Sequence, residues 1–168
     1  DTLGSTPFML AAVAADVPVM RLFLYHGADT NVTTPVGSTA LMAAAGAATY
    51  AWQSPGTEDE ALEAVKLVLE LGADVNEADE AGNTALHGAA NRGANSIIEL
   101  LLSSGAQLDV ANEEGWMPVT IAQGPVDTVE PFPETYAFLL ELMEKAAVSP
   151  PACPQCSIGF TPDETIIS

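Results

Sequence analysis

Four glycine-containing segments recur along the chain at a nearly constant spacing, and this periodicity limits the fold more than any other feature. The four glycines are separated by 33, 45 and 33 residues and are Gly4, Gly37, Gly82 and Gly115. A second landmark keeps the same step, with Gly-Ala-Asp or Gly-Ala-Gln beginning at Gly27, Gly72 and Gly105. A fixed period of this length indicates stacked supersecondary units, each too small to bury its own apolar face.

Each unit is predicted to be two short helices that follow a tight turn. Glycine supplies the positive φ that such a turn needs, and the threonine two residues later can cap the first helix. These threonines are Thr6, Thr39 and Thr84. A second apolar stripe follows in each unit and ends at the second set of glycines, which suit the left-handed residue after a helix. Thr57 and Glu60 have the spacing of a capping box at the start of one second helix.

These residues resemble the ankyrin repeat, whose signature is Thr-Pro-Leu-His-x-Ala. The segment from Thr84 to Ala89 matches closely, and the segment from Thr6 to Ala11 has methionine in place of histidine. The resemblance covers residues 1–145 and implies an all-α solenoid of helix-turn-helix units with β-turn tips. It also implies a structural role for His87, which hydrogen-bonds turn backbone between units. More narrowly, the order of units looks like the C-terminal part of a longer bacterial ankyrin-array protein.

The spacing divides the chain into four repeats and a tail. We expect repeats at 1–33, at 34–78 with a 12-residue insertion, at 79–111 and at 112–147, followed by a Pro-rich tail at 148–168. Prolines delay the second helix of the fourth repeat, which is therefore expected to be a divergent cap. The first repeat lacks capping character, because Phe8 and Leu22 would leave an apolar flank uncovered. Further upstream repeats or a covering chain are therefore expected at the N-terminal end.

Charge narrows the choice of partners. The chain has 23 acidic and 4 basic residues, a formal net charge of −19. Because polyanionic ligands are bound through Lys and Arg, nucleic acid is a poor partner. No run approaches the ~20 apolar residues of a membrane span, so no direct membrane insertion is expected. The acidic residues serve either solubility or the steering of a partner with a basic surface.

The resemblance implies protein binding through the turn tips and the inner face of the first helices. Carried over by position, these residues are Leu3, Val36, Glu80, Glu113, Glu114 and Trp116 at the tips and Arg92 on an inner helix. Trp116 replaces the serine or asparagine of the other units, so it is expected to be exposed as an interface hot spot or to fold back over the Pro-rich loop. The insertion carries Tyr50 and Trp52, which either pack against a neighbouring loop or contact a partner.

Catalysis and cofactor binding have little support. The chain has two histidines and no nucleophile–base motif or glycine-rich phosphate loop, so we predict no enzyme activity, cofactor or metal ligand. Cys153 and Cys156 leave four alternatives open: a local disulfide, two unreactive thiols, a zinc site completed by a partner, or a redox pair.

The tail either docks on a partner through Ile158 and Phe160 or folds back over the last repeat. The sequence therefore predicts a non-catalytic protein–protein interaction module, a scaffold or accessory subunit of a larger assembly. The alternative is a redox- or zinc-linked accessory protein that uses the two cysteines. Few lysines and the cysteine pair favour an extracytoplasmic location, in a bacterial periplasm or secreted.

Overall fold

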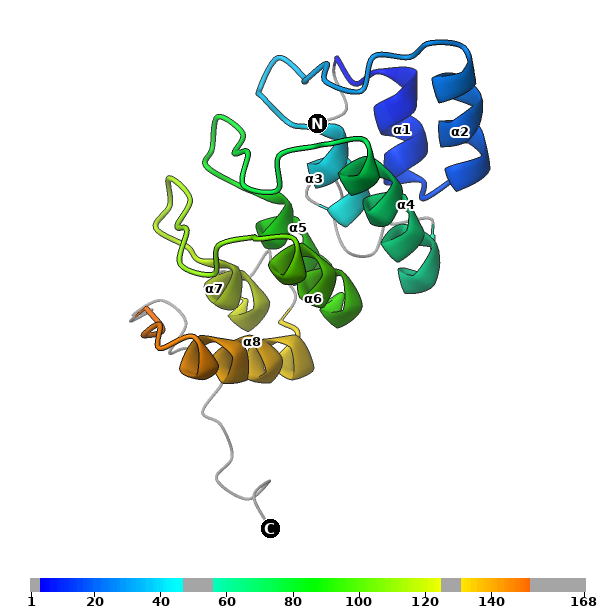
Figure 1. The fold of residues 1–168 in the computed structure, drawn as a ribbon. Coiled ribbons are helices and arrows are strands. Elements are labelled where there is room, and N and C mark those ends of the chain that lie inside the picture. The colour runs from blue at the N-terminus through cyan, green and yellow to red at the C-terminus, as the bar shows by residue number, and fades with distance from the viewer. Residues whose placement is uncertain (1–3, 47–55, 125–130, 152–168) are drawn as a thin grey trace.

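A computed structural model describes residues 4–46, 56–124 and 131–151 of the chain (Figure 1). Within those ranges it contains eight helices and no strand, so the predicted all-α solenoid is confirmed. The helices are α1 (Pro7–Val13), α2 (Val17–Tyr25), α3 (Ala40–Ala45), α4 (Glu58–Glu70), α5 (Ala85–Arg92), α6 (Asn95–Ser103), α7 (Pro118–Gln123) and α8 (Pro133–Lys145). Each of the four expected repeat ranges contains one pair of them.

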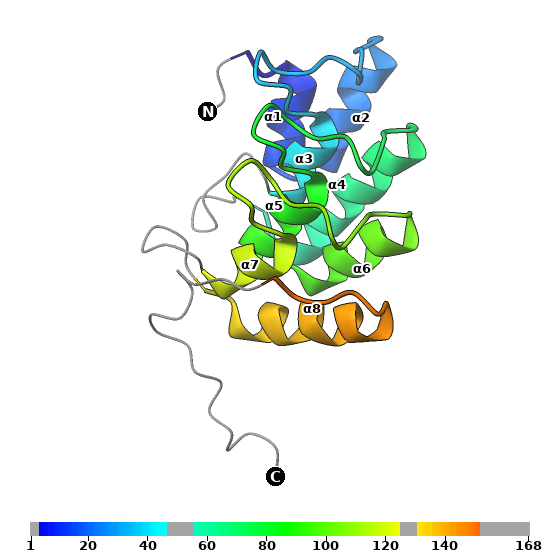
Figure 2. The same cartoon turned by 90° about the vertical axis from the view of Figure 1, so that its left-hand side faces the viewer.

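The helix pairs stack in two rows. The first helices of the pairs, α1, α3, α5 and α7, contact one another in sequence, and α2, α4 and α6 form the second row beside them (Figures 1 and 2). The turn tips that connect successive pairs project from the same edge, on the side of the first row. We call the first row the inner row and the second the outer row. None of the described helices is both long and apolar enough to cross a membrane.

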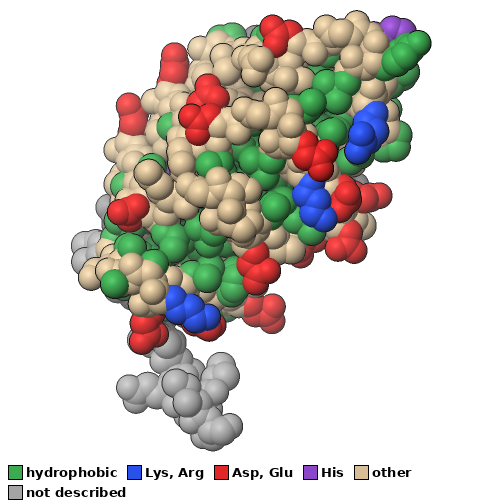
Figure 3. Space-filling model, in the orientation of Figure 1, with side chains coloured by type: hydrophobic (Ala, Val, Ile, Leu, Met, Phe, Trp, Pro, Cys, Tyr) green, Lys and Arg blue, Asp and Glu red, His purple; other side chains and the backbone are tan. Residues whose placement is uncertain are grey.

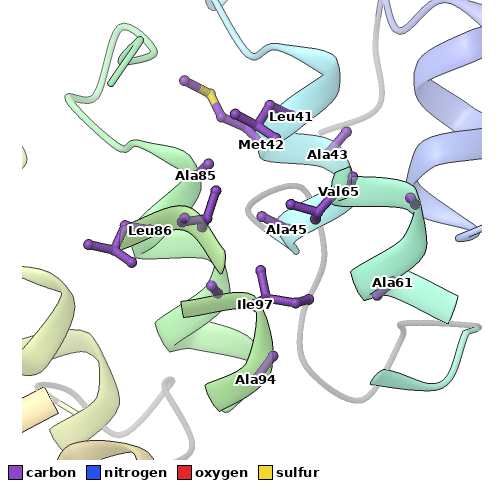
Figure 4. Close-up of a cluster of buried hydrophobic side chains, with 14 of the residues drawn as sticks. Leu41, Met42, Ala43, Ala45, Ala61, Val65, Ala85, Leu86, Ala94 and Ile97 are labelled. Carbon is purple, nitrogen blue, oxygen red and sulfur yellow. The ribbon is translucent and has the colours of Figure 1, made fainter. Parts of the chain in front are cut away.

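The core between the rows combines small and large apolar side chains. Alanines such as Ala44 and Ala89 are fully buried on the inner helices, where their size lets the helices approach closely. Larger residues, among them Leu41, Leu86 and Ile97, converge from α3, α5 and α6 (Figure 4). Truncating one such leucine to alanine costs roughly 2–5 kcal/mol of stability, so these layers hold successive repeats together.

Side-chain caps are present at the expected helix starts of Thr6, Thr39 and Thr57, whereas Thr84 makes no side-chain cap hydrogen bond. The hydroxyl of Thr6 accepts the Met9 N–H at 3.2 Å, and the capping box of the second repeat is present. There the Glu60 N–H donates to the Thr57 hydroxyl at 3.3 Å, and the Thr57 N–H donates to Glu60 Oε2 at 2.8 Å. The Thr57 backbone and side-chain hydrogen bonds hold the pKa of Glu60 below its ordinary value.

A left-handed residue follows the second helix of each repeat. In the fourth repeat this residue is an alanine, which the sequence pattern does not predict. Gly105 has φ +95°, and its N–H and that of Ala106 donate to the carbonyls of Leu102 and Leu101. After α8, Ala147 has φ +57°, and the same pair of bonds runs from Ala147 and Val148 to the last turn of the helix. The fourth repeat therefore keeps the helix-end geometry without its glycine, at a cost of about 1–2 kcal/mol for a left-handed alanine.

Helix α8 closes the last repeat. The Phe132 N–H donates to the Ala122 carbonyl at 2.9 Å, and the Phe132 ring lies against Gly93, where an added Cβ would approach the ring within 2.4 Å. The Thr135 hydroxyl donates to Asn95 Oδ1 at 2.7 Å, which joins α8 to α6. Phe132 and Thr135 thus fix α8 against the third repeat as well as the fourth.

Candidate protein-binding surface

The second, third and fourth turn tips are each built around one polar side chain that lies three residues before the tip glycine. Asp79 Oδ1 accepts the N–H groups of Ala81 and Asn83 at 3.0 and 2.8 Å. Asn112 Oδ1 does the same for the two equivalent N–H groups of the fourth tip, at 3.1 and 2.9 Å. These acceptors satisfy the turn amides from within, so the backbone of the third and fourth tips is hydrogen-bonded without a partner.

Asp79 and Asn112 are not among the tip residues that the resemblance selects. Their spacing could have predicted them, because Thr34, Asp79 and Asn112 are separated by the same 45 and 33 residues as the tip glycines. Each is a short side chain with an oxygen acceptor, and Thr34 Oγ1 accepts the Ser38 N–H at 3.0 Å. Aligning polar positions as well as glycines along the period would have found all three.

Neighbouring tips are joined by hydrogen bonds, so they form one continuous edge. The Glu80 N–H donates to the Val36 carbonyl and the Glu113 N–H donates to the Ala81 carbonyl, both at 2.9 Å. Asn112 Nδ2 also donates to Asn83 Oδ1 at 2.9 Å. The side chains of Val36, Glu80 and Glu113, all expected at the site, are exposed along this edge.

His87 connects the third repeat to the fourth tip. It is 3% exposed, and its Nδ1 accepts the Thr84 N–H at 3.1 Å. Its Nε2 lies 3.1 Å from the Trp116 carbonyl, to which it donates as the neutral tautomer. Burial lowers the pKa of His87, although the bond to the Trp116 carbonyl opposes this. In the fourth repeat Thr120 occupies the same register, and its buried hydroxyl has no hydrogen-bond partner in the described part of the chain.

A small pocket lies between the third and fourth tips and the inner helices. It has a volume of about 180 Å³, and its walls include Asn83, His87, Asn112, Glu114, Trp116 and Ile121. Trp116 is half-buried rather than exposed, because it packs against the hydrophobic core. The expectation of an exposed Trp116 is therefore corrected, and Trp116 forms a wall of this pocket; the alternative contact with the Pro-rich loop involves residues 125–130, which lie outside the described residues.

Arg92 lies at the end of an inner helix, but its guanidinium is directed toward the second repeat. Arg92 Nη2 donates to the Gly56 carbonyl at 2.9 Å, at the start of α4. The carboxylate of Glu58 accepts the N–H and the hydroxyl of Ser96, at 3.1 and 2.6 Å, and so caps α6 from the neighbouring repeat. Arg92 is thus engaged in joining repeats, and its contact with a partner stays a prediction.

The first repeat presents a second exposed surface, on the flank that faces away from the other repeats. Leu10 and Leu22 are 47% and 53% exposed, but the expectation is wrong for Phe8, which is only 1% exposed. The residues at the same register in the second repeat are Ala43 and Leu67, which are only 4% and 5% exposed. Leu10 and Leu22 therefore occupy positions that are buried when another repeat precedes.

Charge is distributed unevenly between the two rows. Of the basic residues, Arg21, Lys66 and Lys145 lie on outer helices or on α8. Lys66 and Lys145 form exposed ion pairs with Glu63 and Glu141, each at 2.6 Å. Figure 3 shows acidic side chains spread over the visible face and far outnumbering the basic ones. The tips therefore carry negative charge with no basic residue beside it in the described ranges.

Several expected site residues lie outside the described residues. They are Leu3, Tyr50, Trp52, Ile158 and Phe160, together with Cys153 and Cys156. Among the residues that are described, no group of three or more His, Cys, Asp or Glu side chains could hold a metal ion.

Stacked helix pairs with hydrogen-bonded turn tips define a solenoid repeat protein. A family model described as ankyrin repeats (3 copies) matches residues 56–132, and a model of a single ankyrin repeat matches residues 3–35. The chain belongs to the ankyrin repeat family. The mouse (Mus musculus) protein "Ankyrin repeat and SOCS box protein 16" is 36% identical over 117 residues, which cover 70% of this chain and 25% of that protein. The chain thus spans about a quarter of the length of this curated relative, and the narrower resemblance to a bacterial array stays a prediction.

Proposed function

We propose that this chain is a non-catalytic scaffold or accessory subunit that binds another protein along its turn tips and inner helices. Ankyrin repeats form a protein–protein interaction fold, and both family models that match the chain are of this kind. The single observation that supports this location most strongly is the hydrogen-bonded edge of the second, third and fourth tips.

A hydrogen-bonded edge favours binding because little backbone entropy is lost when a partner docks. The tip amides are already held by Asp79 and Asn112, so they need no reordering. Val36 offers an exposed apolar contact, and the half-buried Trp116 offers a large aromatic surface next to the pocket. Aromatic anchors in partly formed pockets are the residues that most often dominate binding energy at protein interfaces.

We also propose that the apolar flank of the first repeat is covered in the functional protein. The contrast between Leu22 and its counterpart Leu67 supports a helix pair in that place, either an upstream repeat or another chain. This second contact is independent of the tip surface, since it lies on the end of the stack.

Site-specific photo-crosslinking tests the location of the main surface. A photoreactive residue replaces Glu113 on the fourth tip in one variant and Glu99, an exposed position on α6, in a matched control. Both are incubated with extract from the source organism, and crosslinked proteins are identified by mass spectrometry. We expect a specific partner from position 113 that is lost when Trp116→Ala is added, and none from position 99. Crosslinking to the same partner from position 99 alone would contradict the proposal.

A further inference from the structure

We propose that the pocket between the third and fourth tips binds a Lys or Arg side chain from an extended, basic segment of the partner. This inference rests on the proposed function and assigns a chemical class to the group that enters the same surface.

The pocket has the dimensions and walls that a long side chain with a charged end requires. Its volume of about 180 Å³ is several times the ~30 Å³ that one water molecule occupies in the liquid. Trp116 and Ile121 contribute apolar wall, against which the methylene stem of Lys or Arg can pack. An indole face also attracts a cation through its quadrupole, by about 0.5–2 kcal/mol.

Glu114 is the wall residue that can meet the charge of that side chain. It is exposed at the rim, and its backbone N–H is already held by Asn112. In the described part of the chain, no hydrogen bond or ion pair engages its carboxylate. The same holds for Glu80 and Glu113, which lie on the same edge.

The side-chain amide of Asn112 is less suited to recognise an occupant, because both of its ends are already hydrogen-bonded. Asn112 Nδ2 is committed to Asn83 Oδ1, and Asn112 Oδ1 to the tip backbone. Burial lowers the pKa of His87, the remaining titratable wall residue, and so disfavours its charged form. A negative group would be repelled by the Glu114 carboxylate, and a purely apolar group would desolvate Glu114 without compensation.

In the described part of the chain, no Lys or Arg side chain occupies the pocket beside Glu114. Lys66 and Lys145 pair with glutamates of their own helices, and Arg92 donates to the Gly56 carbonyl. Arg21 lies on α2, in the outer row of the first repeat. A cation that pairs with Glu114 would therefore come from outside the described residues, and an extended segment of a partner can approach it along the tip edge.

A peptide titration tests the inference directly. The probe is a short Gly/Ser-rich peptide with one central Arg, compared with two matched peptides that carry citrulline or Glu at that position. Because the chain has two tryptophans, the Trp52→Phe background leaves Trp116 as the reporter of fluorescence. We expect saturable quenching by the Arg peptide, at least 10-fold weaker binding of the citrulline peptide and none of the Glu peptide.

Two variants separate a specific pocket from general attraction to an acidic protein. Glu114→Gln should weaken binding of the Arg peptide at least 5-fold, whereas Glu99→Gln on α6 removes the same charge elsewhere and should leave it within 2-fold. Both positions are exposed, so neither change should alter folding, which circular dichroism checks. Equal effects of the two variants, or equal binding of the Arg and citrulline peptides, would overturn the inference.

The outcomes also distinguish this inference from the proposed function. If the partner crosslinks from position 113 but its binding is unchanged by Glu114→Gln, the tip surface stands and the cation pocket is refuted. If the Arg peptide needs Glu114 but the partner crosslinks only from position 99, the pocket stands and the proposed binding surface is refuted.

Discussion

The two ends of the stack differ in how well their apolar side chains are covered. At the C-terminal end, α8 buries Leu139 and Met143 in the core and leaves Glu141 and Lys145 exposed to solvent. At the N-terminal end, α2 leaves Leu22 half exposed and Tyr25 85% exposed. A solenoid needs a polar outer face at each end. The comparison indicates that the described chain supplies its own cap at one end only.

The junction between the second and third repeats has more side-chain hydrogen bonds than the junction between the first and second. Asn76 bridges the second and third repeats, since its Nδ2 donates to the Gly105 carbonyl at 3.0 Å and its Oδ1 accepts the Gln107 N–H at 3.0 Å. Asn31 stands at the same register in the first repeat, but no such bridge from its side chain appears in the described part of the chain. The first repeat is therefore expected to separate from the stack more readily than the others.

Matched leucine truncations at the two ends should give the largest contrast. Leu139→Ala removes a fully buried side chain and should lower the free energy of unfolding by about 2–4 kcal/mol. Leu22→Ala removes a half-exposed one and should cost less than about 1 kcal/mol. Chemical denaturation monitored by circular dichroism measures both. Comparable losses at the two ends would mean that the first repeat is as well covered as the last.

Between pH 5 and pH 8, the pH dependence of stability should come from the third repeat, where His87 occupies a register that holds Met9 and Met42 in the first two. Burial lowers the pKa of His87 from the ordinary value of 6.5, so between 6.5 and its folded pKa the unfolded chain binds more protons. Stability should therefore fall as pH drops below 6.5, by at most about 1.4 kcal/mol per pH unit from this residue.

The variant His87→Met removes that titration and keeps the other histidine. It should be less stable than the wild type at pH 8, and the difference in unfolding free energy should shrink between pH 6.5 and 5. A difference that stays constant with pH would show that His87 does not titrate on unfolding in that range.

Matched asparagine variants should give the smallest contrast. Asn76→Ala removes two hydrogen bonds between repeats and should cost about 1–2 kcal/mol. Asn31→Ala should change the unfolding free energy by less than about 0.5 kcal/mol. Hydrogen exchange would show where the structure is weakened: the Gln107 amide should exchange faster in Asn76→Ala than in the wild type. Equal costs for the two variants would contradict the difference between the junctions.

The helix pairs could be predicted from the sequence because their signals are local. Glycine at a turn and threonine at a helix start act within a few residues, so a repeat of these residues indicates a repeat of structure. The cap at Thr57 follows from the same kind of signal. The candidate site was predictable only as far as the tip positions, because the family resemblance places those by register.

The remaining features depend on contacts between distant residues. Arg92 could be placed on an inner helix, but not the direction of its guanidinium, because Gly56 lies 36 residues away. The half-buried position of Trp116 depends on how the fourth tip packs on the third, and Ala147 adopts a conformation that its residue type does not favour. The repeat pattern of the sequence does not predict such contacts.

Hydrogen–deuterium exchange of the complex with the crosslinked partner tests the central claim most directly. If the partner binds the tip edge, exchange should slow at residues 79–83 and 112–117 and stay unchanged at the exposed positions of α6. Amides whose exchange is already slow in the free protein serve as the internal reference. Protection confined to α2, α4 and α6, with the third and fourth tips unaffected, would contradict the claim that this edge is the binding surface.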